Sequence, residues 1–323
     1  MQCETIPEVR GWLSESHGDL TERLVETTQL RLDAGTGELC IAGEARYKLQ
    51  QRALTQLAKH LQIPLPYFNS CPTHIQAANV NHWLHEKNVR QWLLRFRGDT
   101  VRAVLVNRYA PPRNVDVLDA LDRIKPESPF RIQSCHIDEN TFDLRLDFPD
   151  HEASVGLLSD GRSDLLRVGI HVRNSEVGAE PLQVKAMVYR LVCQNGLLPG
   201  SPREIFTIKL DADRLTDELA RDIRYASQQA WTTVRPMREA HDVRIENPVG
   251  YIVAQATRAF SNAFAQECVD AFKREGADAT LYCVVNAFTR AAQLHPIDRR
   301  IQIETFAGRL LTDHQIAPGC TAP

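Results

Sequence analysis

The sequence lacks the short motifs that name a reaction. It has no G-x-x-x-x-G-K phosphate loop, no G-x-G-x-x-G after a predicted strand, no G-x-S-x-G and no H-E-x-x-H. These motifs place particular groups on a phosphate, a dinucleotide, a serine nucleophile or a zinc ion. The sequence therefore gives no support to the enzyme classes that depend on them, and it predicts no cofactor.

Clustered cysteines and long apolar runs are also missing. The eight cysteines are scattered, and no two have the C-x-x-C spacing of zinc ligands. Such scatter is typical of free thiols in a reducing cytosol. No stretch approaches the ~18 apolar residues of a membrane-spanning helix, and the first residues have no apolar signal core. We therefore expect a cytoplasmic protein that does not enter a membrane.

Lysine is scarce, and arginine takes its place. Lysine supplies 7 of the 38 basic residues, which leaves 31 arginines, and the formal net charge is −3. This balance excludes a protein that is basic all over, but it allows a local basic face. A guanidinium group binds phosphates with two parallel hydrogen bonds and stacks on bases. The abundance of arginine and alanine also fits the codon bias of a GC-rich genome.

Hydrophobic patterns predict a mixture of helices and strands up to residue 196. Hairpins are expected over 30–41 and 91–106, and helices over 44–61 and 114–124. Four further strands with short connections follow, over 130–138, 141–149, 165–174 and 182–196. Short connections between successive strands predict an antiparallel meander and not a parallel sheet with crossover helices.

The last third of the chain has helical patterns. Helices are expected over 211–234, 247–276 and 281–311, the last with a break at His295-Pro296. The predicted fold class is α+β, with a central antiparallel sheet, a helical N-terminal segment and a helical C-terminal third. We expect one compact unit in three parts: a hairpin and helical segment over 1–90, a β-rich core over 91–210 and a helical region over 211–323.

The stretch YRLVCQNGLLPG, residues 189–200, ends a predicted strand on a thiol. An activated cysteine needs a base within reach, and His136 and His171 are expected in neighbouring strands. No signature of a thiol enzyme surrounds Cys193, however. Asn195-Gly196 suits a tight chain reversal, because both residue types adopt positive φ. We therefore expect Cys193 to be a small buried residue at a strand end.

Residues 136–152 are acidic, and strand alternation places Asp143, Arg145 and Asp147 on one face. Carboxylates grouped in this way bind the metal ions of two-metal nucleases. Arg145 stands between the two aspartates, however, and is expected to neutralise them. The favoured interpretation is a salt-bridged or solvated sheet face with no metal, and a metal-dependent nuclease ranks third among the functions considered.

Basic side chains on the predicted strands suggest a surface for nucleic acid. In the strand over 165–174, Val168, Ile170 and Val172 alternate with the basic residues, which share the face opposite the core. Arginines track phosphates and aromatic rings stack on the bases of a single strand. The alternative explanation is an ordinary solvated sheet face. The residues expected at the surface are Arg95, Arg97, Arg108, Tyr109, Arg113, Arg167, His171, Arg173 and Lys185.

Two further arginine positions test this interpretation. Arg190 is five residues from Lys185, so we expect it either inward against a carboxylate or outward at an irregular strand end. Arg299 and Arg300 follow Pro296 at a predicted helix start, where the helix dipole disfavours cations. They need an internal partner such as Asp298 or Glu304, or an external phosphate.

Three segments in order resemble a known family. VRAVLVNRYAPPRNVDVLDAL, YRLVCQNGL and NAFTRAAQL…DRRIQIETFAGRLL resemble, over residues 45–311, the phage/plasmid-like family of unknown function found in phages, plasmids and laterally transferred bacterial loci. The resemblance implies a context of mobile-element biology and carries no catalytic residues with it.

From these observations we predict a single-stranded nucleic-acid-binding protein of mobile-element DNA metabolism, of an annealing or recombination type, that forms a homo-oligomer. The second hypothesis is a non-enzymatic, oligomeric accessory protein of phage origin.

Overall fold

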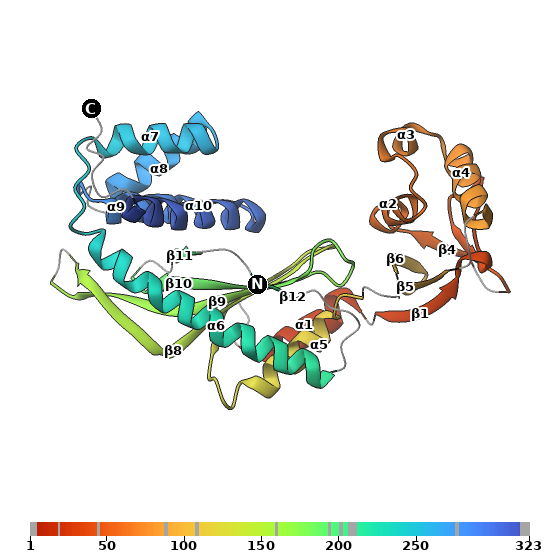
Figure 1. Cartoon of the computed structure of the whole chain (residues 1–323), viewed down its shortest axis with the longest axis horizontal. Coiled ribbons are helices and arrows are strands. Elements are labelled where there is room, and N and C mark those ends of the chain that lie inside the picture. Colours follow the sequence, from red (N-terminus) through yellow and green to blue (C-terminus); the bar gives the residue numbers. More distant parts are fainter. Residues whose placement is uncertain are drawn as a thin grey trace.

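The structure of the chain, a computed structural model, describes ten segments. They are residues 5–18, 20–43, 46–86, 90–106, 110–158, 161–192, 195–199, 203–205, 212–274 and 278–316. The described elements form two lobes, each with its own sheet and its own hydrophobic core (Figure 1). Arg108, Tyr109 and Cys193 lie outside the described residues, so the expectations placed on them stay predictions.

The first lobe contains a six-stranded sheet. Its strands are β1 (Thr21–Glu26), β2 (Leu30–Leu32), β3 (Leu39–Ile41), β4 (Arg46–Leu49), β5 (Gln91–Arg97) and β6 (Thr100–Val106), in the spatial order β1-β5-β6-β4-β3-β2. β4 and β6 are parallel, and the other neighbours are antiparallel. Helices α2 (Gln51–His60), α3 (Leu65–Ser70) and α4 (Thr73–Glu86) share a core with this sheet.

The sequence patterns predicted some of the secondary-structure elements of this lobe correctly and others wrongly. The hairpins over 30–41 and 91–106 are confirmed. The helix expected over 44–61 is wrong at its start, because residues 46–49 form β4 and α2 begins at Gln51. Tyr47 pairs with β3 and Lys48 pairs with β6. These backbone hydrogen bonds to distant strands override the local helix propensity.

The structure also corrects the expectation of one central sheet. β5 pairs with β1 along its length, from Gln91 opposite Glu26 to Phe96 opposite Thr21. The hairpin over 91–106 therefore belongs to the first sheet and not to the strands that follow residue 130. The α+β class itself is confirmed.

The second sheet is the antiparallel meander that the sequence predicts. It consists of β7 (Arg131–Ile137), β8 (Phe142–Leu157), β9 (Ser163–Asn174), β10 (Leu182–Arg190) and β11 (Asn195–Leu197), with β12 (Arg203–Ile205) also paired to β10. From β7 to β11, each strand lies beside the one that precedes it in sequence. Val168, Ile170 and Val172 are buried as expected.

β8 is longer than its sequence pattern indicates. The prediction ended the strand at Pro149, whereas β8 continues to Leu157. The pairing of β8 with β9 shifts register between Asp147 and Glu152. Pro149 lies in this irregular stretch, where the N–H that proline lacks is not needed for the ladder.

The chain reversal predicted at Asn195-Gly196 lies earlier, because both residues already belong to β11, and the glycine is needed for a different reason. Arg190 of β10 lies opposite Asn195 of β11. Gly196 is extended within β11 and does not adopt positive φ. A Cβ atom there would collide with the side chain of Met187 and lie 3.2 Å from Oε1 of Glu304. The glycine therefore permits close packing over the second sheet.

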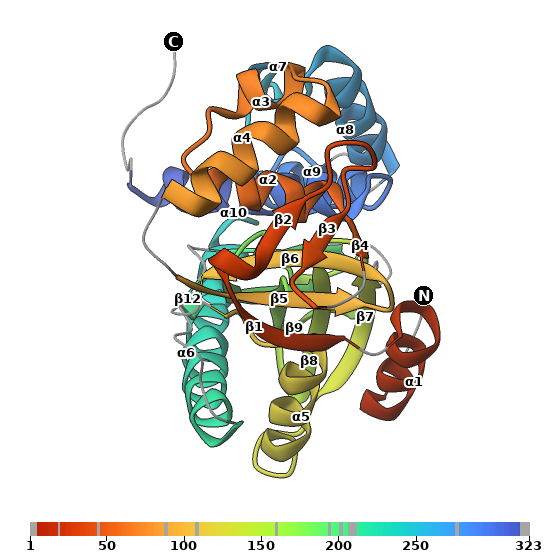
Figure 2. The ribbon, with the colours of Figure 1, turned by 90° about the vertical axis from the view of Figure 1, so that its right-hand side faces the viewer.

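Helices lie on both sides of the second sheet (Figures 1 and 2). α1 (Ile6–His17), α5 (Asn114–Ile124) and α6 (Ala212–Glu239) are below it in Figure 1, and α7 (Pro248–Ala259), α8 (Asn262–Arg274), α9 (Leu281–Ala292) and α10 (Ile297–Ile316) are above it. The single helix expected over 247–276 is instead α7 and α8. Oγ of Ser261 accepts the N–H of Phe264 and so caps the start of α8.

Helix α10 is joined to the polar face of the second sheet by a buried ion pair. Arg145 of β8 donates two hydrogen bonds to Glu304, at 2.9 Å to Oε1 and 2.7 Å to Oε2. The two side chains are 2% and 0% exposed. Arg300, one turn earlier on α10, donates to Oε1 at 2.8 Å, so the expected internal partner of Arg300 is confirmed. Gly308 lets α10 approach the carbonyl oxygen of Leu198, which would lie 2.6 Å from an added Cβ atom.

The charge of Glu304 is expected to be essential for stability. Glu304→Gln keeps the shape of the side chain but leaves Arg145 and Arg300 buried without a full counter-charge. Removing one partner of a buried pair costs about 3–5 kcal/mol. Urea unfolding of both proteins, followed by circular dichroism, measures the difference. The matched control is Arg235→Ala, which breaks an exposed pair with Glu239 and is expected to leave the unfolding midpoint in place. If the unfolding midpoint of Glu304→Gln equals that of the unmodified protein, the charge of Glu304 is not essential for stability and the prediction is wrong.

Candidate functional site

The residues expected at a nucleic-acid surface fall into two groups. Arg167, His171, Arg173 and Lys185 lie on neighbouring strands of the second sheet, on one face. Arg95 and Arg97 lie on β5, and Arg113 directly precedes α5, so these three lie where the first lobe meets the second. The second group lines two cavities, and Arg113 belongs to both of them.

The group on the second sheet lies beneath α10 and is bound by internal carboxylates. His171 is fully buried, and its Nε2–H donates to Oδ1 of Asp143 over 2.8 Å. Arg173 donates to Asp143 at 3.0 Å, to Glu180 at 2.7 Å and to Asp298 of α10 at 2.6 Å. A single guanidinium group therefore ties β9 to β8, to the following loop and to the C-terminal helices.

Arg167 and Arg190 of this sheet are paired in the same way. Arg167 donates to Asp147 at 2.6 Å and to Glu152 at 2.9 Å. Arg190 projects to the opposite face and donates to both oxygens of Asp164, at 3.0 and 2.9 Å, which confirms the inward alternative. Lys185 is half-buried and lies opposite His171 in the strand register.

The expectation of an open, arginine-bearing face on this sheet is therefore wrong. Strand alternation placed the basic residues together correctly, but His171 and Arg173 are buried, and Asp298 of α10 binds Arg173. Arg167 is half-buried and paired with Asp147. Arg145 was also expected to neutralise Asp143 and Asp147, and it binds Glu304 instead. The two aspartates are bound by other basic residues. Asp143 is bound by His171 and Arg173. Asp147 is bound by Arg131 and Arg167.

Burial and pairing shift the pKa values in this network. Burial lowers the pKa of His171 below its ordinary value, and this outweighs the hydrogen bond to Asp143. Its Nδ1 atom is buried with no hydrogen-bond partner among the described residues, so a proton there would be unsolvated. Burial alone would raise the pKa of Glu304, but Arg145 and Arg300 outweigh it and lower that pKa overall. The folded state thus favours a neutral His171 and an ionised Glu304.

Arg95 has a structural role at the junction between the lobes. Its side chain is 3% exposed and pairs with Glu22 of β1 at 2.7 Å. It also donates to the carbonyl oxygen of Pro111 at 2.6 Å and to that of Glu176. Arg95 therefore fastens β5 to the segment that leads into α5, and it is not free to bind a ligand.

The junction cavity, as we call it, lies between α1, the end of β5 and the start of α5, and has a volume of about 340 Å³. Three arginines line it: Arg10 of α1, Arg97 of β5 and Arg113. Glu176, from the loop between β9 and β10, is the one carboxylate among its lining residues. Two of these arginines already pair with carboxylates just outside this lining, Arg10 with Asp119 at 2.5 Å and Arg113 with Asp116 at 2.7 Å.

Arg97 is the least compensated cation of the junction cavity. Its Nη2 atom lies 3.7 Å from Oε1 of Glu176, and its buried Nε has no hydrogen-bond partner among the described residues. Burial, and next the charge of Arg102, lower the pKa of Arg97. Glu176 also accepts the backbone N–H of Asn114 at 3.1 Å, so the same carboxylate caps α5. An anion entering here would meet Arg97 and the positive end of a helix dipole.

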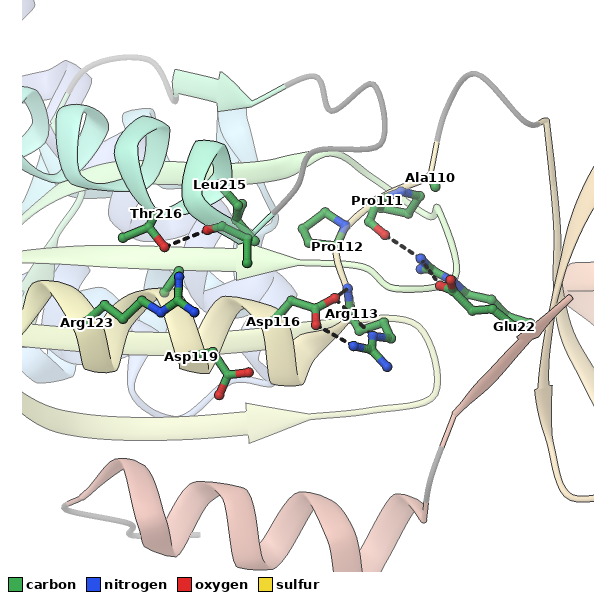
Figure 3. Close-up of a pocket in the computed structure, with 13 residues that line it drawn as sticks. Glu22, Ala110, Pro111, Pro112, Arg113, Asp116, Asp119, Arg123, Leu215 and Thr216 are labelled. Carbon is green, nitrogen blue, oxygen red and sulfur yellow. Dashed lines mark hydrogen bonds and ion pairs between the residues drawn. The ribbon is translucent and has the colours of Figure 1, made fainter. Parts of the chain in front are cut away.

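A second cavity of about 420 Å³ adjoins at Arg113 and is electrically balanced (Figure 3). Arg113 donates to Asp116 at 2.7 and 3.0 Å, as the dashed lines in Figure 3 show. Arg123 of α5 pairs with Asp213 of α6 at 2.9 Å. Each arginine of this lining has a close carboxylate partner, including Arg95 with Glu22 at 2.7 Å, whereas Arg97 of the junction cavity lies 3.7 Å from Glu176. An anion therefore gains less here than beside Arg97.

Carboxylates and thiols do not gather into a metal site in the described part of the chain. There, no three His, Cys, Asp or Glu side chains lie together as ligands would. Asp143 and Asp147, on which the nuclease hypothesis depends, are held by basic side chains. No described helix is both long and apolar enough to cross a membrane.

Comparison of the chain with protein-family models, with curated proteins and with solved structures finds no match. The resemblance to the phage/plasmid-like family therefore stays a prediction. The junction cavity depends in part on Arg10 and Glu176, which the sequence did not single out. They lie far from Arg97 along the chain, and no local pattern joins them.

Acidification is expected to destabilise the protein through His171. Its pKa is lower in the folded state than in the unfolded chain, so the unfolded chain takes up the proton first and stability falls as the pH drops below about 6.5. His171→Gln removes this titration. Urea unfolding at pH 7.5, 6.5 and 5.5 should show a smaller loss of stability for the variant.

Burial also lowers the pKa values of His60 and His241. These two residues therefore add the same loss of stability on acidification to the unmodified protein and to the His171→Gln variant. The difference between the two pH dependences therefore isolates His171. Parallel curves for the variant and the unmodified protein would contradict the assignment of a buried, neutral imidazole.

Proposed function

We propose that the protein binds single-stranded nucleic acid and that the junction cavity takes its phosphate groups. The observation that carries this proposal is the incompletely paired Arg97 in a cavity that Arg10 and Arg113 also line. Guanidinium groups form charge-assisted, often bidentate, hydrogen bonds with phosphate oxygens.

The incomplete pairing of Arg97 supports an external anionic partner. A buried cationic group with an unused N–H is costly unless something accepts its hydrogen bond. The nearest carboxylate, Glu176, is at 3.7 Å and is shared with the start of α5. A phosphate in the cavity would pair with the guanidinium group of Arg97 and add a negative charge at the helix N-terminus.

The position of the cavity favours a flexible strand. It lies in a recess between α1, β5 and α5, so a phosphate must enter between elements of two lobes. A single strand can bend its backbone into such a recess, whereas the phosphates of a duplex lie on a stiff cylinder. Arg108 and Tyr109 immediately precede Ala110 in the sequence and stay candidates for contacts along the strand. The mobile-element context and the homo-oligomer stay predictions from the sequence.

Replacing two cavity arginines is expected to weaken binding and its salt dependence. Arg10→Ala with Arg97→Ala removes two positive charges from the cavity lining. For a single strand, the slope of log affinity against log salt should flatten by about 0.7 for each lost phosphate contact. Fluorescence anisotropy with a labelled oligonucleotide at several salt concentrations measures the slope, and circular dichroism checks that helicity is unchanged.

Three further variants sharpen this experiment. Arg235→Ala removes one exposed arginine on α6 and should leave affinity and slope unchanged. Arg97→Lys keeps the charge but loses the planar fork, so we expect an intermediate affinity. Glu176→Gln removes the competing negative charge and should strengthen binding. Absence of binding by the unmodified protein at low salt would overturn the proposal and leave the accessory-protein hypothesis in front.

A further inference from the structure

A third cavity, which we call the aromatic pocket, lies on α6 away from the junction. It has a volume of about 280 Å³ and is formed by the loop over 127–129, by β8 and by one side of α6. The residues that matter here are Phe148, His151, Arg224, Gln228 and Trp231. It shares no lining residue with the junction cavity.

Three rings form one wall of the aromatic pocket. The ring centroids of Phe148 and His151 are 5.7 Å apart, and those of His151 and Trp231 are 5.9 Å apart. Phe148 is buried, whereas Trp231 is 38% exposed. A tryptophan that presents its indole to a cavity is a surface on which a planar ring can stack.

Polar groups stand around these rings. Nδ1 of His151 is buried with no hydrogen-bond partner among the described residues. Gln228 offers an amide with two donors and an acceptor. Glu127 and Asp150 oppose the single cation of Arg224, so the ionised lining has a slight negative excess. Such a lining suits an uncharged ring with donors and acceptors on its edge, and it disfavours a phosphate.

We propose that the aromatic pocket binds a nucleobase, which stacks on Trp231 and satisfies Nδ1 of His151. A cavity of about 150 Å³ takes up benzene, and typical ligand pockets begin at about 300 Å³. At about 280 Å³ the pocket therefore fits a heteroaromatic ring larger than benzene. A buried imidazole nitrogen without a partner favours a ring with polar edge atoms over a plain hydrocarbon.

Calorimetric titration of the full chain with adenosine, guanosine, cytidine and uridine tests this inference, with AMP and indole as comparison ligands. At least one nucleoside should bind saturably and more tightly than both AMP and indole. Trp231→Ala should weaken nucleoside binding about 5- to 150-fold, the range given by alanine substitution at base-stacking rings. Trp83→Ala is the matched control, because Trp83 on α4 is 39% exposed and lies in the first lobe, and it should bind as the unmodified protein does.

His151→Phe separates recognition of a base edge from simple apolar binding. The variant keeps a ring and loses Nδ1, so it should lose the preference for a nucleoside over indole. The proposal is overturned if no nucleoside binds, if Trp231→Ala binds as well as the unmodified protein, or if indole matches every nucleoside. The last result would indicate an apolar pocket for a protein side chain.

A competition experiment tests whether the bound base belongs to a free nucleoside or to a nucleic-acid strand. Bound adenosine is challenged with a ten-residue deoxyadenosine strand and with an abasic strand of the same length. Displacement by the first strand alone supports a base within a strand, and displacement by neither supports a free nucleoside. Displacement by both would contradict the proposal, because the competing group would not be a base. Nucleosides carry no phosphate, so the junction cavity plays no part in their titration, and either proposal can fail without the other.

Discussion

The buried pair of Arg145 and Glu304 is the contact on which the arrangement of the second lobe depends. Two charges without access to water are stable only if both remain paired, so α10 has to stay on the sheet. Gly196 and Gly308 permit the close packing that this contact needs. Once α10 is in place, it covers the face that carries His171 and Arg173, and Asp298 at its start binds Arg173. The polar face of the second sheet is therefore used for folding.

Arginine acts as the main connector between distant segments of the chain. Arg95 joins β5 to β1 and to the segment before α5, and Arg173 joins two strands, a loop and α10. A guanidinium group suits this work because it offers five donors in a fixed plane and stays ionised when buried. The preference for arginine over lysine suits this fold, because an ammonium group would bind several carbonyl and carboxylate oxygens at once less well than a guanidinium group does. Arg97 differs because part of its hydrogen-bonding capacity is unused.

Local patterns predicted the meander, the α+β class and the placement of Arg190 on the face opposite Lys185, because these depend on alternation and on short connections. The same alternation could not distinguish a solvated face from one covered by a helix, because Arg167, His171 and Arg173 share one face in either case. The error over 44–61 has a similar origin, since β4 is a strand only through its distant partners. Arg97 and Arg113 were identified as candidate site residues from the sequence. Arg10 and Glu176 were not, because only the tertiary fold brings α1 and the loop after β9 to the start of α5.

The central claim is that nucleic acid binds where the two lobes meet and not on the second sheet. Hydrogen–deuterium exchange of the full chain, with and without a saturating single-stranded oligonucleotide, tests it most directly. The account predicts slower exchange in α1, at the end of β5 and at the start of α5, with β9, β10 and α10 unchanged. Slower exchange in β9, β10 and α10, with no change at the start of α5, would contradict it.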